Sequence, residues 1–378
     1  MIYRSFLRPI LFRLSPETAH ELALDSLSVF LSPSPIRKVV AARHRGWPLG
    51  PIKRFGLEFA NPIGLAAGFD KNGTAAESLA ALGFGFIEVG TVTSEAQSGN
   101  EKPRLFRLAS DHALINRLGF NNCGAAQLAE NVRGHRPDCV LGVNIGKSRR
   151  VAIADAIPDY LASFTAVYDV ADYIAINISS PNTPNLRELQ RREPLAELLK
   201  ALQERNDELA KDKPLHPKKP LLVKIAPDLS ERDLEAIIEV ALHANVAGII
   251  ATNTTVNRDH LRASPADVQA CGEGGLSGAP LRTRANEVIS LIHRLTHGQL
   301  PIVGVGGVFT AEDAWDKICA GASLVQLYTG FIYEGPKVAK KINQGLAEIL
   351  KREGFKSLDE AKGCSAKGLK RTPKTNLS

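Results

Sequence analysis

The sequence predicts an α/β fold, a (β/α)8 TIM barrel that carries a helical extension at its N-terminus. From residue 61 onward, short runs rich in Ile, Val, Ala and Gly alternate with longer segments of helical periodicity. This alternation is typical of a parallel sheet built from repeated βα units. There are eight such runs in the 378 residues, and eight repeats in one domain favour a closed barrel.

The predicted strands are continuous apolar runs, as expected for strands that are buried on both faces. Helical periodicity between them predicts helices, for example over residues 188–210, 231–243 and 311–320. Two connections, residues 92–138 and the polar segment after the fourth strand, are long, and connections of this size often carry function. The strands are predicted over residues 62–68, 84–91, 139–144, 173–178, 221–226, 246–252, 301–306 and 324–329.

The first 45 residues predict two short helices that stand apart from the barrel. Apolar residues recur at helical spacing before and after a break at Ser15-Pro16, where Ser15 can cap the second helix. Seven Lys or Arg stand against three Asp or Glu in this segment. An apolar face with basic flanks suits a membrane surface, but helices that simply pack on the barrel would show the same periodicity, so both interpretations stay open.

The domain boundaries follow from these patterns. We expect an extension over residues 1–45, a barrel over residues 46–352, and a flexible, Lys-rich basic tail over residues 353–378. No apolar run is long enough to cross a bilayer.

The composition narrows the class of protein further. The net charge of +7 is compatible with an anionic partner, but aromatic residues make up only 6% and no basic stripe interleaves with them, so we expect no nucleic-acid binding. The cysteines are odd in number and form no CxxC pair, which predicts a reducing compartment with neither a disulfide framework nor a metal site. They are Cys123, Cys139, Cys271, Cys319 and Cys364.

Polar residues or glycines follow nearly every predicted strand, at the end where a TIM barrel builds its active site. Any one of them could be an ordinary turn or cap residue, but eight coincident strand ends predict a functional site. Residues 68–73 follow the first strand, and the later strands end at or near Thr91, Asn144, Asn177, Lys224, Thr252, Gly306 and Thr329.

Glycines near the seventh and eighth strands predict a phosphate site, because TIM barrels often bind phosphate there through backbone N–H groups. The run Gly304-Val-Gly-Gly-Val-Phe309 is not GxGxxG, and no acidic residue follows about 20 positions later. A Rossmann dinucleotide site is therefore disfavoured, and the phosphate of a flavin mononucleotide fits better.

Several long motifs resemble those of the dihydroorotate dehydrogenases. They are NISSPNTPNLR at residues 177–187, NRLGFNN at 116–122, GFDKNG at 68–73 and QLYTG at 326–330, and the likeness runs from about residue 3 to 350. The soluble class of that family carries Cys where this chain has Ser180, whereas the quinone-linked class carries Ser and an N-terminal helical extension. Residues 15–20 and 103–107 also resemble the quinone-linked class, which favours a membrane-docked quinone tunnel for residues 1–45.

The resemblance implies oxidation of dihydroorotate to orotate in pyrimidine (UMP) synthesis, with FMN as cofactor and a membrane quinone as electron acceptor. Ser180 would be the base, with Thr183 as a proton relay through water and Phe120 as a shield, because a serine hydroxyl is weak at neutral pH and needs such a partner. Asparagines can both donate and accept hydrogen bonds, which suits an amide-rich ring. The implied substrate residues are Lys71, Asn116, Arg117, Leu118, Gly119, Phe120, Asn177, Asn182, Asn253 and Thr254.

The same resemblance assigns the cofactor and quinone residues. A lysine beside the flavin pyrimidine edge would stabilise the reduced flavin, and Lys224 is placed for that role. His20, Arg107 and Tyr328 would meet the quinone head between the N-terminal helices. We expect a monomer bound peripherally to the cytoplasmic face of a cell membrane. The implied FMN residues are Ala67, Gly68, Thr91, Asn144, Asn177, Lys224 and Thr252, with Gly278, Gly307, Tyr328 and Thr329 on the phosphate side.

Three alternatives stay open. A soluble dihydroorotate dehydrogenase that passes electrons to fumarate or a nicotinamide would keep its activity without residues 1–45. A different FMN barrel oxidoreductase would act on another substrate in a substrate panel. A non-enzymatic binding module would purify without a flavin spectrum.

Overall fold

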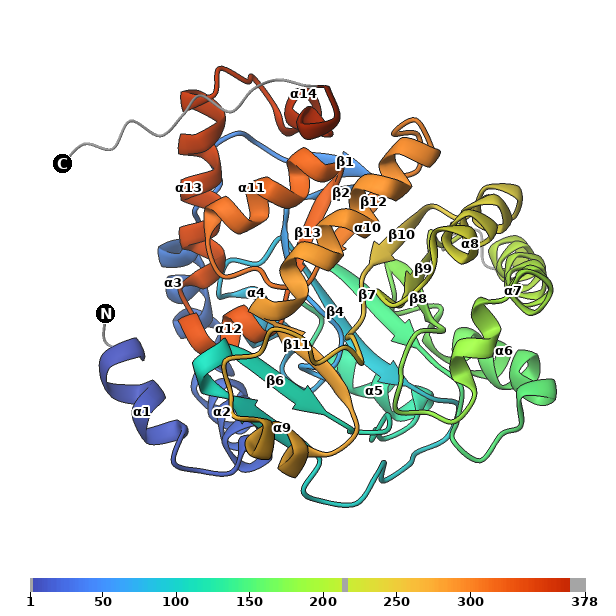
Figure 1. Ribbon diagram of the computed structural model, residues 1–378, viewed down its shortest axis with the longest axis horizontal. Coiled ribbons are helices and arrows are strands. Elements are labelled where there is room, and N and C mark those ends of the chain that lie inside the picture. Colours follow the sequence, from blue (N-terminus) through green and yellow to red (C-terminus); the bar gives the residue numbers. More distant parts are fainter. Residues whose placement is uncertain (1–2, 213–216, 368–378) are drawn as a thin grey trace.

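The computed structural model describes residues 3–212 and 217–367 and contains a closed barrel of eight parallel strands surrounded by helices (Figure 1). The spatial order of the strands is β10-β12-β13-β3-β4-β7-β8-β9, so the predicted (β/α)8 fold is confirmed. The strands are β3 (Ile63–Leu65), β4 (Phe86–Val92), β7 (Val140–Ile145), β8 (Tyr173–Asn177), β9 (Leu221–Ile225), β10 (Gly248–Ala251), β12 (Ile302–Val305) and β13 (Leu324–Leu327).

The helices around the barrel begin where local capping groups allow. Ser230 accepts a hydrogen bond from the Asp233 backbone N–H, and Thr310 forms a capping box with Asp313. The helices predicted over 231–243 and 311–320 are confirmed as α8 (Glu231–His243) and α11 (Ala311–Ala320). The remaining barrel helices are α4 (Ala76–Ala80), α5 (Ala125–Gly134), α6 (Ala156–Val167), α7 (Arg192–Asp212), α10 (Arg282–Leu295), α12 (Thr329–Glu334) and α13 (Val338–Arg352).

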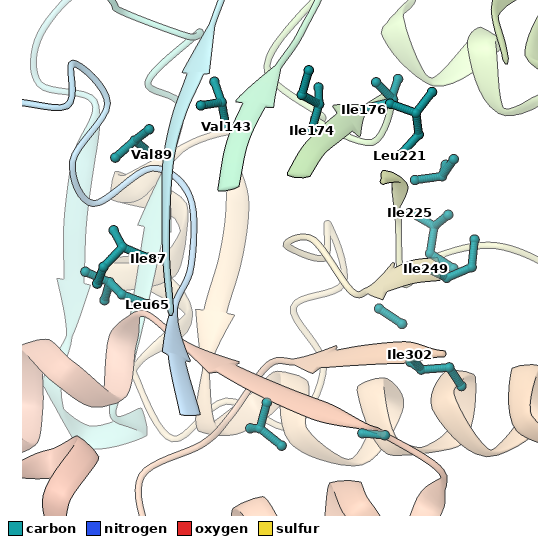
Figure 2. Packing of buried hydrophobic residues seen from close by; sticks show 14 of the residues in the cluster. Leu65, Ile87, Val89, Val143, Ile174, Ile176, Leu221, Ile225, Ile249 and Ile302 are labelled. Atoms are coloured by element: carbon teal, nitrogen blue, oxygen red, sulfur yellow. The ribbon is translucent and has the colours of Figure 1, made fainter. Parts of the chain in front are cut away.

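Successive side chains of each strand point alternately outward and inward, and the two directions have different chemistry. The outward residues form the main core between sheet and helices, as Figure 2 shows for Leu65, Ile87 and Val143. The inward residues form a separate apolar cluster near the strand starts, which includes Phe86 and Tyr173. Polar residues occupy the inward positions that come later along several strands.

A short hairpin closes the barrel at the amino ends of its strands. It consists of β1 (Ile52–Arg54) and β2 (Leu57–Phe59), which pair antiparallel. Phe59 is fully buried and its ring lies edge-on to Phe86 at 5.3 Å between centroids. Apolar side chains therefore fill the amino end of the barrel.

A second sheet lies outside the barrel, and sequence patterns did not predict it. Strands β5 (Leu105–Leu108) and β6 (Ala113–Asn116) come from the long 92–138 segment, and β11 (Gly275–Gly278) comes from the chain between β10 and α10. In the antiparallel register of β6 and β11, Asn116 pairs with Gly275 and Ala113 with Gly278. This sheet therefore brings two distant loops together beside the barrel mouth.

The N-terminal extension folds into more pieces than the two helices predicted. It comprises a π-helical turn (Tyr3–Leu7), α1 (Arg8–Leu11), α2 (Pro16–Leu31) and α3 (Ser34–His44), and α2 packs on α3, α4 and β5 beside the barrel (Figure 1). Tyr3 anchors the first turn by donating its hydroxyl to the Ile332 carbonyl at 2.6 Å. None of the described helices is long and apolar enough to cross a membrane.

Two predictions about the C-terminal segment are wrong. Residues predicted as a flexible tail from 353 onward instead form α14 (Leu358–Ala361) and a 3-10 turn (Cys364–Lys367) that pack on α11. Leu358 and Ala361 are buried there, so their apolar contacts outweigh the Lys-rich composition of the segment. Cys364 forms a disulfide with Cys319 of α11, which overturns the expectation of no disulfide. Residues 368–378 of the predicted tail lie outside the described residues.

Candidate active site

A cavity opens at the carboxyl ends of the barrel strands and encloses about 970 Å³ when the solvent space at its mouth is included. Most of the predicted substrate and cofactor residues line this cavity, although they come from nine separate segments of the chain. The predicted residues that line it are Ala67, Gly68, Lys71, Thr91, Asn116, Leu118, Gly119, Phe120, Asn177, Ser180, Asn182, Lys224, Thr252, Asn253, Thr254, Gly278, Gly307, Tyr328 and Thr329.

Three predicted residues do not line this cavity. The Arg117 guanidinium is directed elsewhere, since it donates to the carbonyls of Pro103 and Glu273 and stacks over the Phe106 ring. Asn144 donates to Glu88 Oε1 at 2.9 Å and accepts from Thr91 Oγ1 at 2.5 Å, and Thr183 is buried on the loop that carries Ser180. The predicted role of Arg117 in substrate binding therefore stays a prediction, and its guanidinium is engaged by protein carbonyls in this structure.

Ser180 is buried and lies on the loop after β8, where its side chain faces the cavity. The backbone N–H of Asn182 donates a hydrogen bond of 3.2 Å to Ser180 Oγ. Arg187 fastens the same loop across the barrel mouth by donating to the Ser179 carbonyl at 3.2 Å and the Thr254 carbonyl at 3.4 Å. The hydroxyl is thus held in place, with its oxygen already accepting one hydrogen bond.

Thr183 is buried, and its Oγ1 has no hydrogen-bond partner among the described residues. A buried hydroxyl without a partner is costly, so its presence three residues after Ser180 calls for a bound water or ligand group.

Four asparagines form the polar wall of the cavity. Asn182 donates to the carbonyl and the side-chain oxygen of Asn116 at 3.1 and 3.2 Å, which joins the β8 loop to the outer sheet. Asn253 donates to Ser179 Oγ at 3.1 Å, and Ser179 donates to Asn177 Oδ1 at 3.0 Å. These contacts hold the amides in place at the cavity wall, and an amide group can both donate and accept hydrogen bonds.

Lys71 supplies positive charge at one side of the cavity. Its Nζ donates to Asn121 Oδ1 at 2.5 Å. The pKa of Lys71 is lowered to about 7. Burial is the main cause, the nearby Arg104 guanidinium also lowers this pKa, and Glu17 raises it. An anionic substrate would supply the counter-charge that this lysine lacks.

Glycines near the ends of β11 and β12 also line the cavity. Gly278 and Gly307 have φ values of +102° and +70°, and a Cβ at Gly278 would come within 2.3 Å of the His112 carbonyl oxygen. Without side chains, the backbone here can approach a ligand closely. Ser277 and Thr329, whose hydroxyls lie 2.9 Å apart, add polar groups beside these glycines. This donor set fits a phosphate.

A buried acid beneath the cavity was missed by the sequence analysis. Glu88 is an inward residue of β4 and lies 3.7 Å from Lys224 Nζ. A charged residue inside an otherwise apolar strand, Phe-Ile-Glu-Val-Gly at 86–90, was the available signal. A buried charge of this kind needs partners, and those partners only become visible in three dimensions.

A second cavity of about 930 Å³ lies between the N-terminal helices and the barrel, and its lining is mostly apolar. His20 and Arg107 line it, as predicted for the quinone site, whereas Tyr328 lines the first cavity. Phe69 lines the second cavity and packs on Tyr328 at 5.6 Å between ring centroids. The two cavities therefore share a wall made of these two rings.

The polar groups of the second cavity are held by the extension itself. Arg107 donates to the Leu14 carbonyl at 2.8 Å and its guanidinium lies 4.6 Å from the centroid of the Phe12 ring. His20 lies edge-on to Phe69 at 4.9 Å. Burial lowers the pKa of His20 to about 4, and the positive charge of Lys71 contributes to that shift, so the imidazole is neutral at neutral pH.

Comparison with known proteins gives consistent results. The family model described as dihydroorotate dehydrogenase matches residues 52–350. A protein of Gloeobacter violaceus named dihydroorotate dehydrogenase (quinone) is 50% identical over 371 residues, which cover 95% of this chain and 98% of that protein. A protein of Roseiflexus with the same name is 49% identical, with 95% and 97% covered.

Among solved structures, the dihydroorotate dehydrogenase of Eimeria tenella in complex with ferulenol is similar to this chain. It superimposes with a TM-score of 0.80 at 36% sequence identity, and the match covers 94% of this chain and 99% of that one. The ligand-free form of the enzyme from the same organism gives a TM-score of 0.79 at 38% identity, covering 88% and 98%.

Proposed function

This chain belongs to the dihydroorotate dehydrogenase family, and we propose that it oxidises dihydroorotate to orotate in pyrimidine biosynthesis and transfers the electrons to a quinone. The observation that carries this function is the pair of cavities that share the Phe69–Tyr328 wall. One cavity is lined by amides and suits a polar ring, and the other is apolar and suits a quinone. The relatives named for the quinone reaction align with 95% of this chain, so the alignment includes most of the extension that builds the second cavity.

The family is flavin-dependent, and we take the flavin to be FMN. When bound, the flavin accepts a hydride from one ring carbon of dihydroorotate. The glycines Gly278 and Gly307 suit its phosphate because they leave their backbone open to a ligand. Lys224 and Thr91 also line the cavity, and an ammonium group beside the flavin would favour its reduced form.

Ser180 is the base that removes the proton from the neighbouring ring carbon. The hydrogen bond that its Oγ accepts from the Asn182 backbone N–H stabilises negative charge on that oxygen. The proton then leaves through Thr183, whose unpartnered Oγ1 can hold the water that such a relay needs. Phe120 also lines the cavity and screens this proton path from solvent.

The asparagine wall and Lys71 bind the substrate. Asn116, Asn177, Asn182 and Asn253 offer donors and acceptors to the amide groups of the ring. Lys71 faces the carboxylate, and the positive charge of this lysine is stabilised when the carboxylate binds.

The quinone enters the second cavity between α1, α2 and the barrel. Its apolar ring would contact the apolar lining, while Arg107 and the neutral imidazole of His20 meet its carbonyl oxygens. The Phe69 and Tyr328 rings, 5.6 Å apart between centroids, would lie between a quinone in the second cavity and a flavin in the first.

The extension also docks the protein peripherally on a membrane, which we place on the cytoplasmic face of the cell membrane. Its outer surface exposes large apolar side chains, with Phe6, Val29 and Phe30 at 68%, 70% and 72% exposure. Exposed Arg13 and Lys38 lie on the same extension. Apolar groups that enter the lipid and cations that meet anionic headgroups are the two signals of interfacial helices.

The deciding experiment follows the flavin through both half-reactions. The protein is purified in mild detergent, reduced anaerobically with dihydroorotate, and then mixed with a soluble quinone analogue. We expect the flavin absorbance to bleach and then to return. Bleaching without recovery by quinone, but with recovery by fumarate or a nicotinamide, would move the protein to the soluble class. A flavin that dihydroorotate never bleaches would contradict the proposed substrate.

A further inference from the structure

Glu88 is an ionisable group in the interior of the barrel that the proposed reaction does not use. Its side chain is fully buried, and it lies on β4 at the layer beneath the active-site cavity. Three neutral groups donate to its carboxylate at 2.9 Å each, namely Asn144 Nδ2, Tyr173 Oη and Gln326 Nε2. The ammonium group of Lys224 lies 3.7 Å from Oε1.

This arrangement is expensive to build, because taking both a carboxylate and an ammonium group out of water is unfavourable even when they pair. An apolar barrel interior of the same volume would pack without that cost. We therefore expect Glu88 to have a function besides packing, and its hydrogen-bond partners indicate which part of the site it acts on.

Two of the four partners of Glu88, Lys224 and Asn144, connect it to the cavity. Lys224 lines the cavity directly. Asn144 accepts a hydrogen bond of 2.5 Å from Thr91 Oγ1, which in turn accepts one of 2.9 Å from Asn177 Nδ2. A single carboxylate thus fixes the positions of three residues on the cavity floor, Lys224 directly and Thr91 and Asn177 through Asn144.

We propose that Glu88 is a positioning residue that holds Lys224 against the flavin site and offsets its positive charge, and so sets the reduction potential of the bound flavin. This inference rests on the proposed function, in which Lys224 faces the flavin. A reduced flavin carries more negative charge than an oxidised one, so the net charge of the Glu88–Lys224 pair shifts the balance between the two forms. With Glu88 ionised, the pair is neutral; without that charge, Lys224 stabilises the reduced form more strongly.

The variant Glu88→Gln removes the negative charge of Glu88 and keeps a side chain of nearly the same shape. The new amide can keep its oxygen toward Lys224 and Asn144, and its nitrogen can donate to Tyr173 Oη. Gln326 can rotate its amide to present Oε1, which has no partner among the described residues, so the network has a way to adapt. We expect the flavin of the purified Glu88→Gln holoenzyme to become easier to reduce.

The measurement is the midpoint potential of the bound flavin, titrated against a reference dye with no substrate present. We expect the equilibrium to move toward reduced flavin on the order of tenfold, which is about 30 mV for a two-electron couple. Flavin content and thermal unfolding are recorded for the same samples. An unchanged potential in a protein that retains its flavin would overturn the inference, whereas a wild-type protein that holds no flavin at all would overturn the proposed function and this inference with it.

The control is a second buried carboxylate, Asp159, whose hydrogen bonds go to serines and not to Lys224 or Asn144. Asp159 accepts hydrogen bonds from the backbone N–H and the hydroxyl of Ser148 at 2.7 and 2.8 Å. Asp159→Asn should lower the unfolding temperature and leave the flavin potential unchanged. An equal potential shift in Asp159→Asn would mean that any buried-charge defect moves the potential, and would also overturn the assignment.

A second pair of variants keeps the test decisive if Glu88→Gln alone does not fold. Lys224→Gln leaves Glu88 unopposed, so its flavin should be harder to reduce than that of the wild type. Adding Glu88→Gln to Lys224→Gln removes that charge, restores a neutral pair, and should raise the potential again. Equal potentials for the single Lys224→Gln and the double variant would show that Glu88 does not act on the flavin.

Discussion

Arg104 donates two hydrogen bonds to Glu17 Oε1, from Nε at 3.0 Å and from Nη2 at 2.7 Å, and so ties the start of α2 to the segment before β5. The same guanidinium donates from Nη1 to the Ser98 and Asn100 carbonyls at 2.6 and 2.8 Å. Asn100 in turn donates its side-chain amide to the Arg117 carbonyl at 2.8 Å. The helical extension is therefore linked to the loop that begins at Asn116 in the first cavity.

This link predicts that a change in the extension alters substrate binding. Glu17→Gln weakens the ion pair with the nearly buried Arg104, so the 116–121 loop loses part of its support. We expect the KM for dihydroorotate to rise about threefold to tenfold, consistent with the loss of a charge-assisted hydrogen bond. Glu21→Gln is the matched control, because Glu21 is exposed and pairs with the exposed Lys102 at 3.6 Å. A KM that changes equally in both variants would argue against the link.

Lys71 predicts the pH dependence of substrate binding. Its pKa is lowered to about 7, mainly by burial, so in the free protein the ammonium form is lost as the pH rises through that value. The substrate remains a carboxylate over this range, so the attraction weakens as pH increases. We expect kcat/KM for dihydroorotate to fall above about pH 7, and Lys71→Met to have a low and flat profile. A wild-type profile that stays level from pH 6 to pH 9 would contradict this assignment.

The proposed roles of Ser180 and Thr183 predict that their replacement slows flavin reduction to different extents. Ser180→Ala removes the base, and flavin reduction by dihydroorotate should slow by roughly 10² to 10⁴, the usual contribution of a positioned base. Thr183→Val keeps the side-chain shape and removes only the unpartnered hydroxyl, so a smaller loss of about tenfold is expected. Rapid mixing under anaerobic conditions measures both rates. A Thr183→Val protein with the wild-type rate would exclude the relay.

The position of Arg107 predicts that its replacement affects the reaction with quinone and not the reaction with dihydroorotate. Its guanidinium lines only the second of the two cavities and is held by the Leu14 carbonyl and the Phe12 ring. We expect Arg107→Met to raise the KM for a quinone analogue about tenfold and to leave flavin reduction by dihydroorotate within twofold of wild type. Arg8→Met is a control, since Arg8 donates to the Tyr333 carbonyl and does not line that cavity. Slower flavin reduction in Arg107→Met would mean that the two cavities are not functionally separate.

The exposed apolar residues of the extension predict membrane binding. Val29→Ser and Phe30→Ser replace two side chains that are 70% and 72% exposed, so folding should be little affected. We expect the double variant to bind less to vesicles that contain anionic lipid, by about tenfold in partition. The double variant Leu242→Ser and Val256→Ser changes exposed apolar residues outside the extension and should bind as the wild type does. Equal binding of all three proteins would place the membrane contact elsewhere.

Much of the fold and of the first cavity follows from local sequence. The eight apolar runs fix eight buried strands, and the parallel arrangement brings their carboxyl ends to one side of the barrel. Residues such as Asn177 and Lys224, which come at or near strand ends, are therefore placed in the cavity by chain position alone. Helices α8 and α11 were predictable to the residue, because their caps at Ser230 and Thr310 are local signals.

What the tertiary structure decided depends on contacts between residues far apart in the chain. The pairing of Asn116 with Gly275 needs a sheet whose strands come from two distant loops. Leu358 is buried because α11 offers it an apolar surface, which composition cannot reveal. Glu88 is separated from Lys224 by more than a hundred residues and meets it only inside the closed barrel. Periodicity records which face of a strand or helix is apolar, whereas the partner of a buried charge is set by the way the strands close.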